Sequence, residues 1–109
     1  MGLSKNDLFN EEENTLAKYA KALGHPARIA ILSFLIKRNA CVCGDLVDEL
    51  PLSQSTVSQH LKELKKIGLI KGDIEGVKTC YCINLEEWKI VEKQFNQLFS
   101  AIQKMSSCC

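Results

Sequence analysis

Residues 52–67 read Leu-Ser-Gln-Ser-Thr-Val-Ser-Gln-His-Leu-Lys-Glu-Leu-Lys-Lys-Ile, and the spacing within them decides the fold. One apolar stripe recurs at helical intervals: Val57, Leu61, Leu64 and Ile67. Ser53 stands where an N-cap residue belongs, because its hydroxyl can accept a hydrogen bond from a backbone N–H that the first turn leaves unpaired. The stretch is therefore predicted to form a helix with one buried side.

The other side of this helix carries short polar groups at the same spacing. These are Ser55, Ser58, Gln59 and Lys62, with Gln54 just above them. No carboxylate precedes Glu63 on this side, whereas most solvated surface helices carry many Glu and Lys residues. Hydroxyls and amides hydrogen-bond base edges and phosphates, so the pattern favours a helix in the major groove of DNA over a solvated surface helix.

A tight turn joins this helix to a shorter one. The preceding segment, roughly Gly44 to Leu50, is predicted to be helical, and Pro51 ends it two residues before the next helix begins. Two helices connected in this way form a helix-turn-helix. Gly68 is expected to end the second helix at its C′ position.

Residues 69–74 and 77–83 are predicted to form two strands around Glu75-Gly76. A hairpin directly after a recognition helix is a wing, and Lys78 near its tip could reach an adjacent minor groove. We therefore expect DNA contacts from Ser53, Gln54, Ser55, Thr56, Ser58, Gln59, His60, Lys62 and Lys78. For His60, a structural or phosphate-contacting role is favoured over metal ligation.

Three further helices are predicted around this unit: about Lys5 to Leu23, Pro26 to Asn39-Ala40, and Leu85 to about Met105 with Asn84 as its cap. The first should bury Leu16, Tyr19, Ala20 and Leu23, extended by Leu8 and Phe9. The last has a broad apolar stripe that a small domain cannot cover, so a second subunit is expected to cover it. The chain is thus predicted to be a mainly α (α+β) winged helix-turn-helix of about five helices with a two-stranded β-hairpin wing.

Residues 1–109 are predicted to form this single domain, with dimerisation helices at 1–24 and 85–105 and a tail at 106–109. No apolar run reaches the ~20 residues that span a bilayer, and residues 1–7 lack the core of a signal peptide. A cytoplasmic location without a membrane partner is therefore expected. The net charge is only +1, but acidic residues gather near the N-terminus and lysines near the centre, which permits a local basic surface.

The whole chain except the tail resembles the ArsR/SmtB family of metal-sensing bacterial repressors. The resemblance rests on Ala-Leu-Gly-His-Pro-Ala-Arg-Ile-Ala-Ile-Leu at 22–32, on residues 52–61 and on Ile-Gly-Leu-Ile at 67–70. It implies a homodimer that binds a palindromic operator, with half-sites about one helical turn apart, and leaves it when an inducer binds. It implies no enzymatic activity and no cofactor for DNA binding itself.

Cys41-Val42-Cys43 resembles the Cys-Val-Cys of the family's arsenic, antimony, cadmium and lead sensors. Here Gly44 separates the pair from Asp45, and Val47 stands where the family's arsenic sensors often have a third cysteine. A third thiolate must therefore come from elsewhere. Residues two apart on a helix point to nearly opposite sides, so Cys41 and Cys43 can share one ion only on non-helical backbone. The alternative for this pair is ordinary packing at the start of a helix.

Cys108 and Cys109 on the tail are candidates for the missing thiolate of either subunit. Alternatively, they form a separate two-thiol site or belong to an inert tail. Together with Cys41 and Cys43 they predict a site for arsenite, an organoarsenical or antimonite, because soft thiolates prefer soft centres. Zinc is disfavoured, because neither histidine lies in the last helix, where the family's zinc sensors place ligands.

Cys80 and Cys82 alternate with Tyr81 and should face one side of the wing. Packing as small buried hydrophobes is favoured for them, and a two-thiol site on the wing stays open.

Two rival inducers remain: thiol oxidation to a disulfide or polysulfide, and cadmium or lead. A thiol enzyme such as an arsenate reductase lacks support, because no nucleophile lies near a phosphate-binding loop or a Cys-x-x-Cys motif. A salt-independent association would instead indicate a protein-interaction module.

Overall fold

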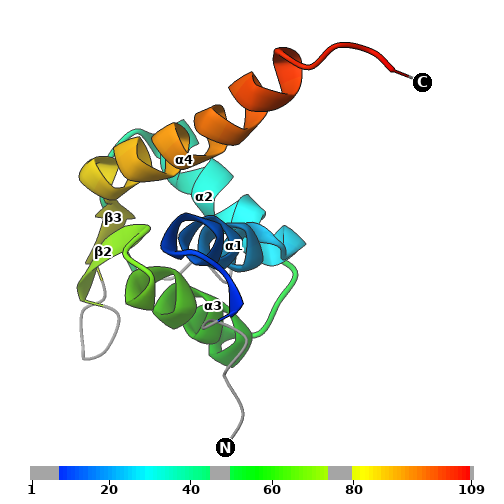
Figure 1. The fold of residues 1–109 in the computed structure, drawn as a ribbon. Coiled ribbons are helices and arrows are strands. Elements are labelled where there is room, and N and C mark those ends of the chain that lie inside the picture. Colours follow the sequence, from blue (N-terminus) through cyan, green and yellow to red (C-terminus); the bar gives the residue numbers. More distant parts are fainter. Residues whose placement is uncertain (1–7, 45–49, 74–79, 109) are drawn as a thin grey trace, which may run out of the picture.

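The computed structural model describes residues 8–44, 50–73 and 80–108, which form helices with a small antiparallel sheet at one edge (Figure 1). The elements are α1 (Glu11–Leu23), α2 (Pro26–Arg38), β1 (Val42–Cys43), α3 (Gln54–Lys66), β2 (Ile70–Asp73), β3 (Cys80–Ile83) and α4 (Leu85–Gln103). This order confirms a mainly α winged helix-turn-helix. The predicted helix at 44–50 lies almost wholly outside the described residues.

Helix α1 begins later than predicted, at Glu11 instead of about Lys5. Asn10 fixes this start through a capping box: its Oδ1 accepts from the backbone N–H of Glu13 at 2.7 Å, and Oε1 of Glu13 accepts from the N–H of Asn10 at 3.1 Å. Leu8 and Phe9 therefore precede the helix and are exposed, so their predicted place in its buried stripe is wrong.

Helices α2 and α3 have the ends that the sequence predicts. Pro26 opens α2 behind His25, whose Nδ1 accepts from the N–H of Ala27, and Asn39 closes it in the left-handed conformation. Ser53 caps α3, because its Oγ accepts from the N–H of Thr56 at 3.4 Å. Gly68 follows α3 with φ of 92°, as expected of a C′ glycine.

The sheet has three strands in the order β1-β3-β2, and all neighbours are antiparallel. The two predicted wing strands pair with each other as β2 and β3, and residues 42 and 43 add a third strand beside β3 that was not predicted. A strand of two residues has no alternation that a sequence pattern could reveal. Its place is fixed by burial: Val42 lies opposite Tyr81, and both side chains enter the core.

The core collects apolar residues from every element, namely Tyr19, Ala22, Ile31, Leu32, Leu35, Val42, Val57, Leu61, Leu64, Leu69, Ile70, Tyr81 and Val91. The apolar stripe of α3 is buried as predicted, with Ile67 half-buried. In α1, by contrast, Ala22 is buried and the predicted Ala20 is exposed.

Helix α4 is held at its first turns. The indole Nε1 of Trp88 donates to the carbonyl of Leu69 at 3.0 Å, and the amide of Asn84 donates to the carbonyl of Gly68 at 3.0 Å. Asn84 is thus the N-cap residue by position, but its side chain binds the turn after α3 and caps nothing. The C-terminal half of α4 extends beyond the rest of the molecule (Figure 1). None of the described helices combines the length and apolar character that crossing a bilayer requires.

Candidate DNA-binding face and cysteine cluster

The polar side of α3 is turned away from the core. We call its residues the recognition face: Ser53, Gln54, Ser55, Thr56, Ser58, Gln59 and Lys62. Thr56 and Ser58 are half-buried and the others are exposed. The structure therefore brings together all predicted DNA-contacting residues of this segment except His60. Lys78 lies outside the described residues.

Hydroxyl groups gather at the N-terminus of α3. The Oγ of Ser53 lies 3.2 Å from Oγ of Ser55 and 3.0 Å from Oγ1 of Thr56. No acidic residue occupies the first turn, so the partial positive charge of the helix N-terminus is not neutralised there. This end of α3 can accept a phosphate or the acceptor atoms of a base edge.

His60 is buried, unlike the rest of the predicted set, with 8% of its surface exposed. Its Nδ1 accepts a hydrogen bond from Nε of Arg28 at 3.2 Å, and Nη1 of Arg28 donates to the carbonyl of Ala22 at 3.2 Å. Burial, followed by the charges of His25 and Arg28, lowers the pKa of His60 from its ordinary value. The structure thus places His60 in a buried contact between α2 and α3. Its partner Arg28 was not singled out from the sequence.

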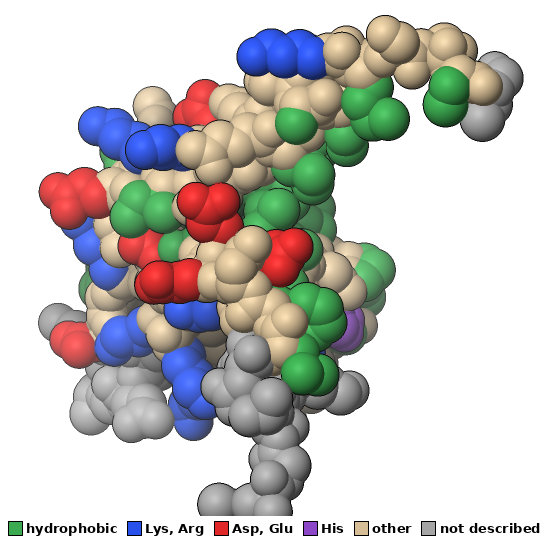
Figure 2. Space-filling model, in the orientation of Figure 1, with side chains coloured by type: hydrophobic (Ala, Val, Ile, Leu, Met, Phe, Trp, Pro, Cys, Tyr) green, Lys and Arg blue, Asp and Glu red, His purple; other side chains and the backbone are tan. Residues whose placement is uncertain are grey.

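Charge is distributed unevenly over the molecule. Figure 2 shows Lys and Arg side chains on the lower part of one face, over α3, Asp and Glu side chains above them, and further Lys or Arg side chains at the top, over α4. The last turn of α3 contributes Lys65 and Lys66, and the first turn of α1 contributes Glu11, Glu12 and Glu13. A local positive surface beside the recognition face suits the phosphate backbone of DNA, although the net charge of the chain is only +1.

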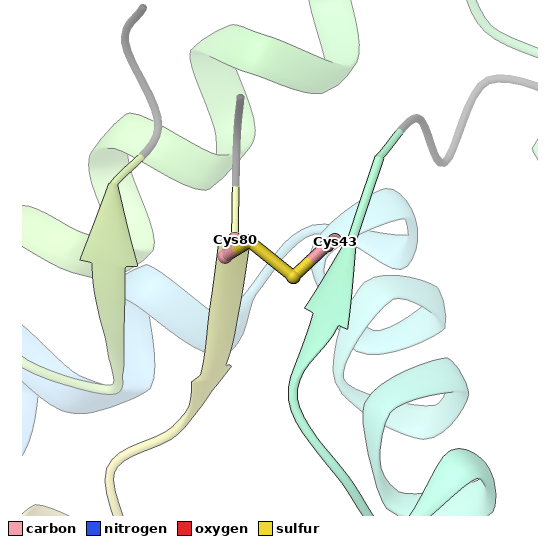
Figure 3. The surroundings of a disulfide bond; sticks show 2 residues. All are labelled: Cys43 and Cys80. Atoms are coloured by element: carbon pink, nitrogen blue, oxygen red, sulfur yellow. A yellow bond between two sulfur atoms is a disulfide. The ribbon is translucent and has the colours of Figure 1, made fainter. Parts of the chain in front are cut away.

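Four cysteines lie on the outward side of the β1–β3 pair, and we call them the thiol face: Cys41, Cys43, Cys80 and Cys82. Cys43 lies opposite Cys80, with 4.0 Å between their Cα atoms, and a disulfide joins them (Figure 3). Cys41 directly precedes β1, and a side-chain hydrogen bond connects its thiol with that of Cys82 on β3. Val42 and Tyr81, the residues between, point to the opposite side, into the core.

The predicted packing of Cys80 and Cys82 as buried hydrophobes is wrong, because both are only half-buried and both face another cysteine. The hydrogen bond to Cys41 raises the pKa of Cys82, and burial and the Cys41 charge add to the effect. Lys71 lies opposite Cys82 on β2, and its charge acts in the other direction. The sequence signal for the cluster was present: both Cys-x-Cys pairs have the two-residue period of a strand.

Cys108 lies far from the thiol face within one chain. It follows α4, whose 19 residues span about 28 Å and begin at the sheet (Figure 1). Cys108 is exposed, and Cys109 lies outside the described residues. The described part of the chain contains no group of three or more His, Cys, Asp or Glu side chains arranged to hold a metal ion.

Comparison with known proteins gives relatives of one kind. Residues 25–71 match the family described as bacterial regulatory protein, arsR family. An uncharacterized HTH-type transcriptional regulator of Methanocaldococcus jannaschii is 37% identical over 81% of this chain and 99% of its own length. A cadmium resistance transcriptional regulatory protein, a CadC homolog of Staphylococcus aureus, is 35% identical over 84% of this chain and 77% of its own. Reduced HlyU from Vibrio cholerae superposes with a TM-score of 0.62 at 26% identity, over 86% of this chain and 97% of its own.

Proposed function

Because this chain belongs to the ArsR family of bacterial regulatory proteins, we propose that it is a homodimeric repressor released from its operator by trivalent arsenic or antimony. The family and the relatives are transcriptional regulators and not enzymes. What this chain's own residues add is the way in which it binds DNA, pairs with a second copy and senses its inducer.

The recognition face of α3 is the part that enters the major groove. The observation that carries this proposal is a set of exposed and half-buried hydroxyl and amide groups along one side of a capped helix. Gln54 and Gln59 are exposed and suited to bidentate contacts with adenine edges, and Lys62 is suited to a phosphate or a guanine. Lys78 of the wing is proposed to reach the adjacent minor groove, and His60 to support the interface through its contact with Arg28.

A second copy of the chain is proposed to pair with the segments 1–24 and 85–105 and to cover the exposed apolar side chains of their described residues. On α4 these include Leu98 with 43% of its surface exposed, Phe99 with 50% and Ile102 with 55%. Leu8 and Phe9, just before α1, are 62% and 55% exposed. Burial of such a side chain stabilises an assembly by about 1.5–3 kcal/mol. A two-fold dimer then requires a palindromic operator.

The inducer site is proposed to include Cys41 and Cys43, which lie on non-helical backbone, as ligation of one ion by both residues requires. Cys108 or Cys109 of either subunit remains the candidate for a third thiolate proposed from the sequence. The relative from Staphylococcus aureus is named for cadmium resistance, so cadmium is the alternative inducer within the same chemistry.

Thiol oxidation is the second candidate signal, and the Cys43–Cys80 disulfide favours it. A hydroperoxide would supply the oxidising equivalents: two thiols lose two protons and two electrons, and the peroxide is reduced to water and an alcohol, or to two waters if it is hydrogen peroxide. Formation of the disulfide would then add a covalent link between β1 and β3 without any metal.

Three parallel titrations discriminate among these signals. The reduced protein is bound to a duplex that it has selected from a random library, and arsenite, Cd²⁺ or hydrogen peroxide is added. Release by arsenite at the lowest concentration, lost in Cys41→Ser and in Cys43→Ser, supports an arsenic sensor with its site at Cys41 and Cys43. Normal release of both serine variants at positions 41 and 43 would remove the proposed inducer site.

A further inference from the structure

The thiol face offers four sulfur ligands where the sequence pattern of Cys41 and Cys43 alone offers two. Its members come from two segments separated by 37 residues in sequence, as the Cys43–Cys80 pair shows. Within each strand the two cysteines are two residues, or about 7 Å, apart. Across the strands Cys43 and Cys80 have Cα atoms only 4.0 Å apart. Cys41 directly precedes β1, and extension of the β1–β3 register by one residue sets it against Cys82. With this extension the four side chains start from the corners of a small rectangle on one side of the sheet.

Such a rectangle suits one thiophilic ion. Sulfur ligands of a tetrahedral ion with bonds of about 2.3 Å lie about 3.8 Å from each other, which side chains that lean inward from these corners can reach. The disulfide demonstrates that the Cys43–Cys80 edge can close to bonding distance. On the opposite edge, the thiols of Cys41 and Cys82 share a side-chain hydrogen bond.

The surroundings support bound thiolates without competing for the ion. Lys71 lies opposite Cys82 and places a positive charge beside the cluster. Val42 and Tyr81, which alternate with the cysteines, are anchored in the core with 7% and 1% of their surfaces exposed. The backbone under the thiol face is therefore held in place before any ion arrives, so little ordering is needed on binding.

We propose that Cys41, Cys43, Cys80 and Cys82 form a single cross-strand site for one soft, thiophilic ion, with half of its ligands on the wing strand. This rests on the proposed function and deepens it, because it assigns the missing thiolates to β3 and not to the tail. A divalent ion such as Cd²⁺ takes all four thiols and releases four protons. Arsenite, As(OH)₃, takes three, with one sulfur–arsenic bond and one water molecule formed for each thiol.

The disulfide state and the ion-bound state exclude each other. A dithiol such as dithiothreitol opens the Cys43–Cys80 bond by exchange: both cysteines return as thiols and the dithiol becomes a cyclic disulfide. Only then are four ligands present. An ion at this site ties β1 to β3. Strand β3 pairs with β2, and β2 is joined to the recognition helix α3 by residues 67–69. The ion-dependent connection can therefore reach α3 through β2.

Binding is measured on the full chain without DNA, so that it is separate from release. The reduced protein is titrated with Cd²⁺ or arsenite, and the thiols still reactive toward a disulfide reagent are counted. Cd²⁺ should protect four thiols per chain and arsenite three. Cys80→Ser and Cys82→Ser should each weaken Cd²⁺ binding by more than about 100-fold. Loss of a residue that only supports a metal ligand costs about 10–100-fold, so a larger loss indicates a direct ligand. Cys108→Ser is the matched control and should bind as the parent protein does.

Two results would overturn the site. One is unchanged Cd²⁺ affinity in Cys80→Ser and Cys82→Ser while both retain the circular dichroism of the parent. The other is full Cd²⁺ affinity in protein whose Cys43–Cys80 disulfide is intact. Loss of binding only in Cys41→Ser, Cys43→Ser and Cys108→Ser would leave the proposed inducer site standing and reject its wing half.

Discussion

The guanidinium Nε of Arg28 on α2 lies 3.2 Å from Nδ1 of His60 on α3 and donates a hydrogen bond to it. The same guanidinium reaches the carbonyl of Ala22 at the end of α1 through Nη1. One side chain thus sets the positions of three helices, and the recognition helix is one of them. The orientation of the recognition face depends on this contact, although none of its residues takes part.

Arg28→Met should lower the free energy of unfolding by about 1–3 kcal/mol, because it leaves the buried Nδ1 of His60 without this donor. DNA affinity should fall as well, since α3 loses a restraint on its angle to α2. Urea denaturation gives the first value and a binding isotherm the second. Lys37→Met, at an exposed position of the same helix, is the control and should change neither by a comparable amount.

Acid should destabilise the protein through His60. Burial and neighbouring positive charge lower the pKa of His60 from 6.5 in the fold, so the unfolded chain binds the proton more readily. Stability is unaffected well above pH 6.5 and declines as the pH falls below it, by at most about 1.4 kcal/mol per pH unit for this one group.

His60→Gln keeps an acceptor for Arg28 but cannot take up a proton. Its unfolding free energy should therefore decline less between pH 7.5 and 5.5 than that of the parent, with carboxylate contributions cancelling in the difference. Parallel curves for the two proteins over this interval would show that His60 is not the group responsible.

The sequence predicts most of the fold because the decisive signals are local. The caps at His25 and Ser53, the helix end at Gly68 and the apolar stripe of α3 all follow from neighbouring residues. The sequence also contained the signal for the late start of α1, namely Asn10 and Glu13 three residues apart. The apolar Leu8 and Phe9 nevertheless favoured a longer helix.

The thiol face could not be predicted in the same way, because it depends on pairing between distant segments. Both Cys-x-Cys pairs show the period of a strand, but the sequence contains nothing that sets Cys43 against Cys80. That register follows from the burial of Val42 against Tyr81, which is a tertiary contact. The role of Arg28 is hidden for the same reason, since its partner lies 32 residues away.

Replacing Gln54, Ser58 and Gln59 with alanine should abolish selective operator binding while the protein stays folded. A good bidentate base contact is worth about 1–3 kcal/mol, so loss of two amides and a hydroxyl should weaken specific binding by about 100-fold or more. Non-specific binding, which depends on phosphate contacts, should persist with its salt dependence. Competition assays with specific and random duplexes measure both.

The matched control removes the same kinds of group from an exposed stretch of α4: Asn96→Ala, Gln97→Ala and Ser100→Ala. This variant should bind the selected duplex as the parent does. If the recognition-face variant also keeps its preference for the selected duplex, α3 is not the element that reads the sequence.

Ser53→Ala should lower the free energy of unfolding by about 1 kcal/mol, because it removes the acceptor for the N–H of Thr56 at the start of α3. The same change removes the hydroxyl partner of Ser55 and Thr56, so operator affinity should fall more than the loss of stability alone explains. Ser33→Ala, exposed within α2, is the comparison for both denaturation and binding and should be nearly neutral.

Phe99→Glu combined with Ile102→Glu should convert the proposed dimer to a monomer without unfolding it. Both side chains are at least half exposed in one chain, and the buried residue of α4 is Val91, two turns earlier. Two carboxylates at a subunit interface would be desolvated without partners, which costs several kcal/mol per charge. Sedimentation velocity at micromolar concentration measures the mass, and circular dichroism checks the fold. Gln97→Glu adds a charge on an exposed polar position of the same helix and should leave the dimer intact. A double variant that sediments as a dimer would move the proposed interface away from this end of α4.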